Sequence, residues 1–294
     1  MSLVPQVLQS LKNLPPFPIV AQKALLLLGK PEVNIQELVD VVKFDPAVTA
    51  NILRTSNSAY FGLSREIHSL HQALLLLGTQ ELLKLIVVSG ATRLFSVPAP
   101  GYYRERLGLW RHSVSCALMM DLLSRKLSWT DGATGFTAGL LHDIGKVVLS
   151  LFVDQKFHDI TLVMEQQGVS FQAAEKVILG IDHAEMGGEM ARLWDFPDRL
   201  RLAITFHHLN KPEAYTDDLT LLVYLADLLV MMFGQEPAAH TPAYTGDPEV
   251  LRHFDLQQQD LEDILRQFSG VWDEAQIFFG LLGSADDLEG ANRR

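Results

Sequence analysis

Apolar residues recur along most of the chain at the spacing of amphipathic helices, about every 3.6 residues. The segment from Leu107 to Leu122 shows this period, whereas the first hundred residues contain no alternating run typical of a strand. Helix start signals divide the pattern into short segments. Asp45-Pro46 combines a capping acid with a proline, and Ser69, Thr79 and Asp131 are further candidate N-caps. The sequence therefore predicts an all-helical fold.

Clusters of helix-breaking residues mark the boundaries of three regions. Pro98 to Gly101 interrupts the first pattern, and a stretch rich in Gly, Pro, Ala and Thr at 234–248 follows the second. We predict an N-terminal helical subdomain over 1–100, with about five short helices, one of them capped by Asn34. A second helical subdomain covers 101–233, and 234–294 forms a C-terminal helical extension that ends in a polar tail from Gly283.

Composition narrows the class of protein. The 294 residues carry a formal charge of -11, so no overall basic field attracts nucleic acid, and direct nucleic-acid binding is not expected. The single cysteine, Cys116, excludes an internal disulfide framework, and beside Ser115 and Ala117 it is interpreted as a small helix-packing residue. No signal peptide pattern opens the chain and its apolar runs are too short to span a bilayer, so we expect a cytoplasmic protein without membrane contact.

Several histidines and aspartates lie within otherwise apolar helical segments. His142 and Asp143 stand side by side between Leu141 and Ile144, where burial without a partner would cost free energy. A divalent metal suits both imidazole and carboxylate. Each histidine alone is also explained as an ordinary core or surface residue, but together they predict a metal site. The candidate ligands are His112, His142, Asp143, His183, His207, His208 and Asp227.

The order of these residues resembles that of the HD superfamily of metal-dependent phosphohydrolases, and more closely its bimetallic HD-GYP variant. The resemblance implies that 101–233 is an HD-like metal-binding subdomain, which holds one or two divalent transition metals (iron, manganese, nickel or zinc). In that case Asp143 bridges the two ions. The implied ligands of the first ion are His112, His142, Asp143 and Asp227, and those of the second are His183, His207 and His208.

Two further features bear on activity. If the protein is an enzyme, Asp143 and Lys146 are the expected catalytic residues, because Lys146 matches a phosphate-contacting residue of relatives; the alternative is a solvated lysine on a helix face. The loop that follows the paired histidines of HD-GYP proteins is replaced here by Leu209 to Glu213. Hydrolysis of cyclic di-GMP is therefore not expected.

The N-terminal half carries motifs that resemble the HDOD domain over roughly residues 10–215. They are Leu14–Pro18, Asp45–Thr49, Asn51–Arg54, Asn57–Gly62 and Ala73–Gly78. Relatives of this kind mostly act as regulatory modules of bacteria, often with eroded metal ligands, whereas this sequence keeps them.

Two classes of function stay open. One is a signal-transduction module whose metal centre is structural or sensory, with an unidentified signalling protein as partner. The other is a metal-dependent phosphohydrolase or phosphodiesterase that acts on a nucleotide or another phosphorylated small molecule. The segment from Arg54 to Asn57 is either a partner surface or an ordinary helix end.

Overall fold

The computed structural model describes residues 4–11, 16–28, 39–40, 42–43, 45–96, 98–103, 105, 107–234 and 246–280. Within these ranges the regular elements are all helices, which confirms the predicted all-helical fold. The predicted helix that starts near Asn34 and the tail from Gly283 lie outside the described residues.

Fifteen α-helices and one short 3-10 helix, η1, are described. Their bounds are α1 Val4–Leu11, α2 Ile19–Leu25, α4 Pro46–Ser56, α5 Leu70–Leu77, α6 Thr79–Phe95, α7 Gly108–Lys126, α8 Gly132–Leu141, α9 Gly145–Gln167, α10 Phe171–Leu179, α11 His183–Leu193, α12 Asp198–Phe206, η1 Pro212–Thr216, α13 Asp218–Met232, α14 Pro248–His253, α15 Gln258–Glu274 and α16 Gln276–Phe279.

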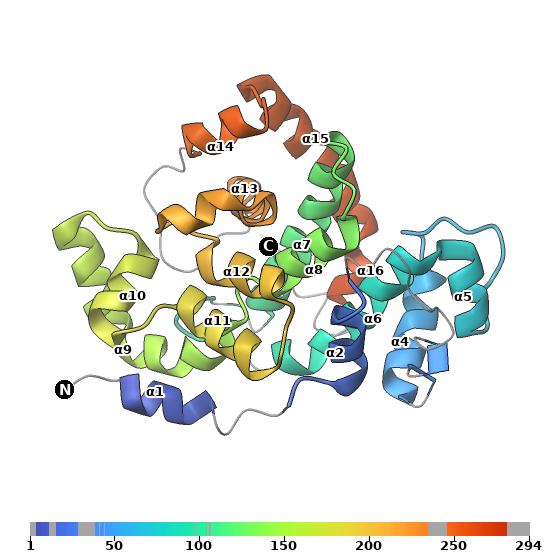
Figure 1. Ribbon diagram of the computed structural model, residues 1–294, viewed down its shortest axis with the longest axis horizontal. Helices are drawn as coiled ribbons and strands as arrows, with labels where there is room; N and C mark the ends of the chain where they lie inside the picture. Colours follow the sequence, from blue (N-terminus) through green and yellow to red (C-terminus); the bar gives the residue numbers. More distant parts are fainter. Residues whose placement is uncertain are drawn as a thin grey trace.

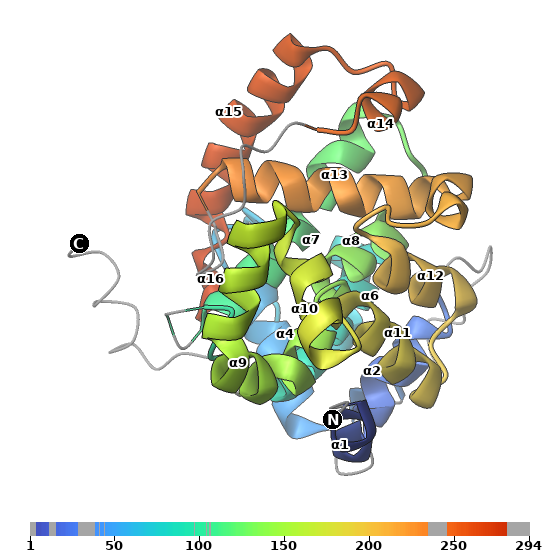
Figure 2. The same cartoon turned by 90° about the vertical axis from the view of Figure 1, so that its left-hand side faces the viewer.

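The helices pack around α7, which contacts α8, α13, α15 and α16. The N-terminal helices α2, α4 and α5 pack on α6, at the opposite side of the molecule from α9 and α10 (Figure 1). In the orthogonal view α13 lies across the molecule, below α14 and α15 and above α11 and α12 (Figure 2). The arrangement places α7, α8, α11, α12 and α13 around one common interior.

Several helix starts agree with the sequence and others do not. Asp45 caps α4 as predicted, its Oδ1 accepting from the amides of Ala47 and Val48, both at 3.1 Å. Ser69 also caps α5, although the Gln72 side chain accepts from the His68 amide and so does not complete the expected capping box.

One predicted cap was wrong, and another lies at the predicted position without the expected side-chain bond. Thr79 is the first residue of α6 rather than its cap, because Gly78 takes the cap position. Asp131 takes the N-cap position of α8 as predicted, but its side chain makes no capping bond. Its carboxylate instead accepts from Arg199 Nη1 at 3.2 Å. A partner on a distant helix thus displaces the local interaction.

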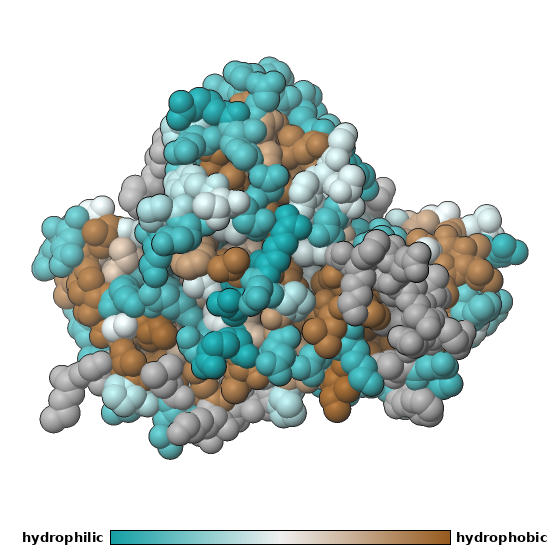
Figure 3. Space-filling view, viewed as in Figure 1, coloured by the Kyte–Doolittle hydropathy of each residue, from teal (hydrophilic) through white to brown (hydrophobic). Residues whose placement is uncertain are grey.

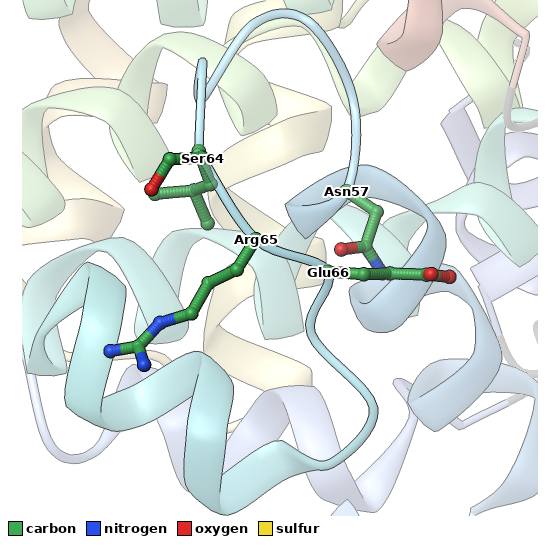
Figure 4. Close-up of a pocket in the computed structure, with 5 residues that line it drawn as sticks. Asn57, Ser64, Arg65 and Glu66 are labelled. Carbon is green, nitrogen blue, oxygen red and sulfur yellow. The ribbon is translucent and has the colours of Figure 1, made fainter.

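Asn57, in the segment considered as a partner surface, closes a loop. Its Oδ1 accepts from the Ile67 amide and its Nδ2 donates to the Ile67 carbonyl, both at 2.7 Å. Asn57 and the loop residues Leu63 to Glu66 line a pocket of about 290 Å³, where the Arg65 side chain extends away from the side chains of Asn57 and Glu66 (Figure 4). Thr55 and Ser56, just before it, are buried.

Although the apolar runs were expected to be too short to span a bilayer, the stretch from Gly132 to Gln167 is long and apolar enough to cross a membrane by length and composition. In the folded chain 83% of its most apolar window is buried among other helices, as in the core of a globular protein. Apolar surface is instead visible at the edge of the molecule formed by α5, where Leu75 is 71% exposed (Figure 3).

Two glycines allow the close helix contacts on which the interior depends. A Cβ on Gly139 would lie 2.8 Å from the Cys116 carbonyl oxygen, so α8 can approach α7 only without a side chain there. A Cβ on Gly145 would overlap the His183 carbonyl oxygen, where the start of α9 meets the start of α11. Both contacts occur beside predicted ligands.

Candidate metal centre

The structure brings all seven predicted ligands together at the centre of the helices. His112 lies on α7, His142 and Asp143 form the turn between α8 and α9, and Asp227 lies on α13. His183 begins α11, while His207 and His208 follow α12. Six of the seven side chains are buried and His208 is partly buried.

Four of these residues form a first donor group. His112 Nε2 lies 3.0 Å from Asp227 Oδ1 and 3.4 Å from Asp143 Oδ2. His142 Nε2 lies 3.4 Å from Asp143 Oδ2 and 3.8 Å from Asp227 Oδ1. Nitrogen and oxygen donors bound to one ion at about 2.0–2.2 Å are separated by about 2.9–3.5 Å. Most of these separations are therefore close to those around a single ion.

The other three histidines form a second donor group. His183 Nε2 and His208 Nε2 lie 2.7 Å apart. Asp143 Oδ1 lies 3.5 Å from His183 Nε2 and 3.7 Å from His207 Nε2. The two oxygens of Asp143 therefore face different groups: Oδ2 faces the first and Oδ1 the second.

Several donor atoms in this interior lack a hydrogen-bond partner among the described residues. Three of them, all buried, lie between the two donor groups: His142 Nε2, His207 Nε2 and Asp143 Oδ1; His112 Nδ1 also lacks a partner. A buried polar atom without a partner costs about 1–3 kcal/mol, so such atoms rarely occur together. A divalent cation would satisfy all three, and the mixture of imidazole and carboxylate suits iron, manganese, nickel or zinc. The residues present fit the predicted metals.

Hydrogen bonds to the opposite ring nitrogens orient three of the imidazoles. His142 Nδ1 donates to the Gly139 carbonyl and His207 Nδ1 to the Ile204 carbonyl, both at 2.8 Å. His183 Nδ1 lies 2.5 Å from Glu175 Oε2. A proton held on Nδ1 leaves the Nε2 lone pair directed at the centre, which is the form that binds a metal.

Glu175 was missed by the sequence reasoning. It is fully buried on α10, where it accepts from His183 Nδ1 and from the Tyr102 hydroxyl. Burial and the Glu175 carboxylate raise the pKa of Tyr102 well above its ordinary value. Glu175 lies one turn from both Phe171 and Leu179, on the apolar face of its helix, and that position was the available signal.

Burial controls the protonation of the second group. Burial and the nearby imidazoles of His142 and His183 lower the pKa of His207 to about 3. Burial, His207 and His183 likewise lower the pKa of His208 well below its ordinary value. Both side chains are therefore neutral near pH 7, as metal ligands must be.

The two aspartates of the first group are held in their charged form. Burial alone would raise the pKa of the Asp143 carboxyl, but Lys146 and His142 hold it well below its usual range. For Asp227, burial is likewise outweighed by the His112 imidazole, and the pKa is lowered. Both aspartates are ionised near neutral pH, which favours binding of a cation.

Lys146 lies inside the centre. Its Nζ is 2.6 Å from Asp143 Oδ2 and lies over the rings of Tyr102 and Tyr103, 5.4 and 5.6 Å from their centroids. The residue is 7% exposed, so the alternative of a solvated lysine on a helix face is wrong. Its contact with phosphate stays a prediction.

Comparison with known proteins gives the same family as the motifs. The sequence profile of the HDOD domain matches residues 14–210. A protein of Treponema pallidum (strain Nichols), described as uncharacterized, is 21% identical over 82% of this chain and 47% of its own length. Ribonuclease Y of Desulfotalea psychrophila is 27% identical over 66% of this chain and 32% of its own length. The chain thus spans about half or less of the length of these curated relatives.

Solved structures match along almost the whole chain. An HDOD domain protein of unknown function from Geobacter sulfurreducens superposes with a TM-score of 0.70, 22% identity and coverage of 95% and 98% of the two chains. A provisionally named phosphohydrolase from Shewanella amazonensis SB2B superposes with a TM-score of 0.69 and 21% identity, over 94% of this chain and 98% of its own. A provisionally named signal transduction protein from Marinobacter aquaeolei VT8 superposes with a TM-score of 0.73 and 22% identity, over 92% of this chain and 60% of its own. At this identity the three matches establish the fold.

Proposed function

We propose that this chain, which belongs to the HDOD domain family, is a bacterial signal-transduction module that keeps a dinuclear metal centre of the HD type. The observation that carries the proposal is the position of Asp143. Its Oδ2 lies 3.4 Å from His112 Nε2, and its Oδ1 lies 3.5 Å from His183 Nε2. One carboxylate between two sets of histidines is the arrangement of a bridging ligand.

In this proposal His112, His142 and Asp227 hold the first ion, while His183, His207 and His208 hold the second, and Asp143 is shared. When bound, two such ions supply Lewis acidity and concentrated positive charge for phosphoryl chemistry. Glu175 fixes the ring of His183, and the Gly139 and Ile204 carbonyls fix those of His142 and His207.

Burial of the donors favours a regulatory centre over a catalytic one. His142, Asp143 and His207 are at most 1% exposed, whereas an ion that turns over a substrate needs an open coordination position. One of the structurally similar proteins is named for signal transduction, which is the class of function proposed here. We propose a signalling protein as the partner, because the chain's charge of -11 disfavours nucleic acid.

Metal analysis tests the centre. Protein purified without chelator is expected to contain two transition-metal ions per chain, and Asp143→Ala is expected to lose both, because it removes the shared ligand. His158→Ala, an exposed histidine on α9, is the matched control and keeps both ions. A wild-type protein that binds no iron, manganese, nickel or zinc contradicts the proposal.

One observation favours the second candidate, a metal-dependent phosphohydrolase. Lys146 places an ammonium group beside Asp143, where it could neutralise a phosphate, and two similar proteins are named ribonuclease Y and phosphohydrolase. A screen of nucleotides, cyclic dinucleotides and other phosphoesters with added manganese or iron separates the two functions. Turnover that is lost in Asp143→Ala supports the enzyme, and metal binding without turnover supports the regulatory module.

A further inference from the structure

The sulfur of Cys116 faces the first donor group. Cys116 follows His112 by four residues on α7, so the two side chains share one face of the helix. Its Sγ is fully buried and lies 3.6 Å from His112 Nε2. Donor atoms of Cys116, His112, His142 and Asp227 all lie within 4.8 Å of one another.

The packing of α8 on α7 fixes this position. Gly139 contacts the Cys116 backbone so closely that a Cβ would lie 2.8 Å from its carbonyl oxygen. The Gly139 carbonyl accepts from His142 Nδ1 at 2.8 Å. The same glycine therefore places Cys116 against α8 and directs His142 Nε2 toward the donor group that Cys116 borders.

The separation between sulfur and nitrogen is that of two ligands on one ion. With a metal–sulfur bond of about 2.3 Å and a metal–nitrogen bond of about 2.0 Å, neighbouring ligands of a five-coordinate ion lie about 3.1–3.7 Å apart. The 3.6 Å separation, at which the metal-free thiol and imidazole are hydrogen-bonded, lies in this range. Independently, His142 Nε2 is buried in the same group without a hydrogen-bond partner among the described residues, which points to an ion at this place.

We propose that Cys116 is a ligand of the first ion, in addition to His112, His142, Asp143 and Asp227. The inference rests on the proposed metal centre and adds a soft donor to it. As the sulfur–metal bond forms, the thiol S–H bond breaks and the proton leaves to solvent. A thiolate favours iron, zinc or cobalt over manganese and magnesium, which prefer oxygen ligands.

Cobalt(II) provides the test, because a thiolate bound to cobalt gives a sulfur-to-metal charge-transfer absorption in the near ultraviolet. Cobalt-loaded wild-type protein is expected to show this band, and Cys116→Ser to lose it while still binding cobalt. Ser115→Ala is the matched control: the neighbouring hydroxyl donates to the Arg111 carbonyl, away from the donor group, so the band stays.

The outcomes separate the two proposals. Cobalt that binds without the band overturns the role of Cys116 and leaves the metal centre standing. A wild-type protein that binds no cobalt and no other transition metal overturns both. If Cys116→Ser does not fold, X-ray absorption of the zinc-loaded wild type decides, since a sulfur neighbour at about 2.3 Å is required and a shell of nitrogen and oxygen alone refutes the assignment.

Discussion

Replacement of Glu175 by glutamine tests whether the carboxylate behind His183 controls the second ion alone. The substitution keeps the size of the side chain and one carbonyl oxygen, but removes the negative charge. In the native protein the buried Glu175 carboxylate accepts hydrogen bonds from His183 Nδ1 at 2.5 Å and from the Tyr102 hydroxyl. Hydrogen bonds to a charged group are about twice as strong as those between neutral groups.

The expected magnitude follows from this geometry. Removing the outer partner of a ligating histidine typically weakens metal affinity about 10–100-fold, which corresponds to about 1.4–2.7 kcal/mol. The affinity for the second ion is expected to fall by this amount in Glu175→Gln. The first ion is expected to keep its affinity, because among the described residues Glu175 makes no hydrogen bond or ion pair with His112 or His142. His142 instead takes its orientation from the Gly139 carbonyl.

Competition against a chelator of known affinity, followed by metal analysis, measures the two binding steps separately. Glu185→Gln is the control, since the Glu185 carboxylate pairs with Lys176 and, among the described residues, forms no hydrogen bond or ion pair with a candidate ligand. Equal weakening of both steps would indicate a general loss of structure. An unchanged second step would refute the reasoning that the buried carboxylate orients His183.

The remaining predictions concern the first ion, the helix contact and pH. Asp227→Ala is expected to lose the first ion but keep the second. It should also lose the stabilisation that the first ion gives, about 2.7 kcal/mol when free metal is at a hundredfold excess over Kd, which is measured as a shift of Tm. Unchanged metal content contradicts the placement of Asp227. Gly139→Ala places a methyl group against the Cys116 carbonyl and is expected to lower the free energy of unfolding by about 1–3 kcal/mol in urea titrations. An unchanged free energy of unfolding would mean that α8 can move away from α7 at no cost. His207 has a pKa of about 3 in the folded protein, so the unfolded chain binds more protons below about pH 6.5, and stability falls as the pH falls. In the presence of chelator, this histidine is expected to lower the free energy of unfolding by about 2 kcal/mol between pH 7 and 5. His207→Gln has no imidazole at this position, so its free energy of unfolding should change less with pH. Equal slopes of this free energy against pH in the two proteins would refute the burial argument.

Signals that act within a few residues could be recognised from the sequence. Asp45-Pro46 starts α4 as expected, because a capping acid and a proline act on the turn that follows them. The adjacent His142 and Asp143 also stood out, since two polar residues in an apolar segment need partners. The all-helical fold followed from the same local periodicity.

Features that depend on distant partners could not be predicted. The Asp131 side chain bonds Arg199 of a distant helix instead of the first turn of α8, which it precedes as predicted. Lys146 is buried because Asp143 and two tyrosine rings surround it, although its sequence neighbourhood resembles an ordinary helix start. Cys116 looks like a packing residue until α8 places His142 beside its sulfur.

The seven candidate ligands come from five places along the chain between residue 112 and residue 227: α7, the turn between α8 and α9, the start of α11, the end of α12, and α13. Ions held there would act as cross-links, joining segments far apart in sequence in the way that disulfides join the strands of secreted proteins. With a single cysteine, the chain has no internal disulfide to serve this purpose. Loss of metal would then loosen several helices at once, so that metal supply becomes a switch on the shape of the whole domain.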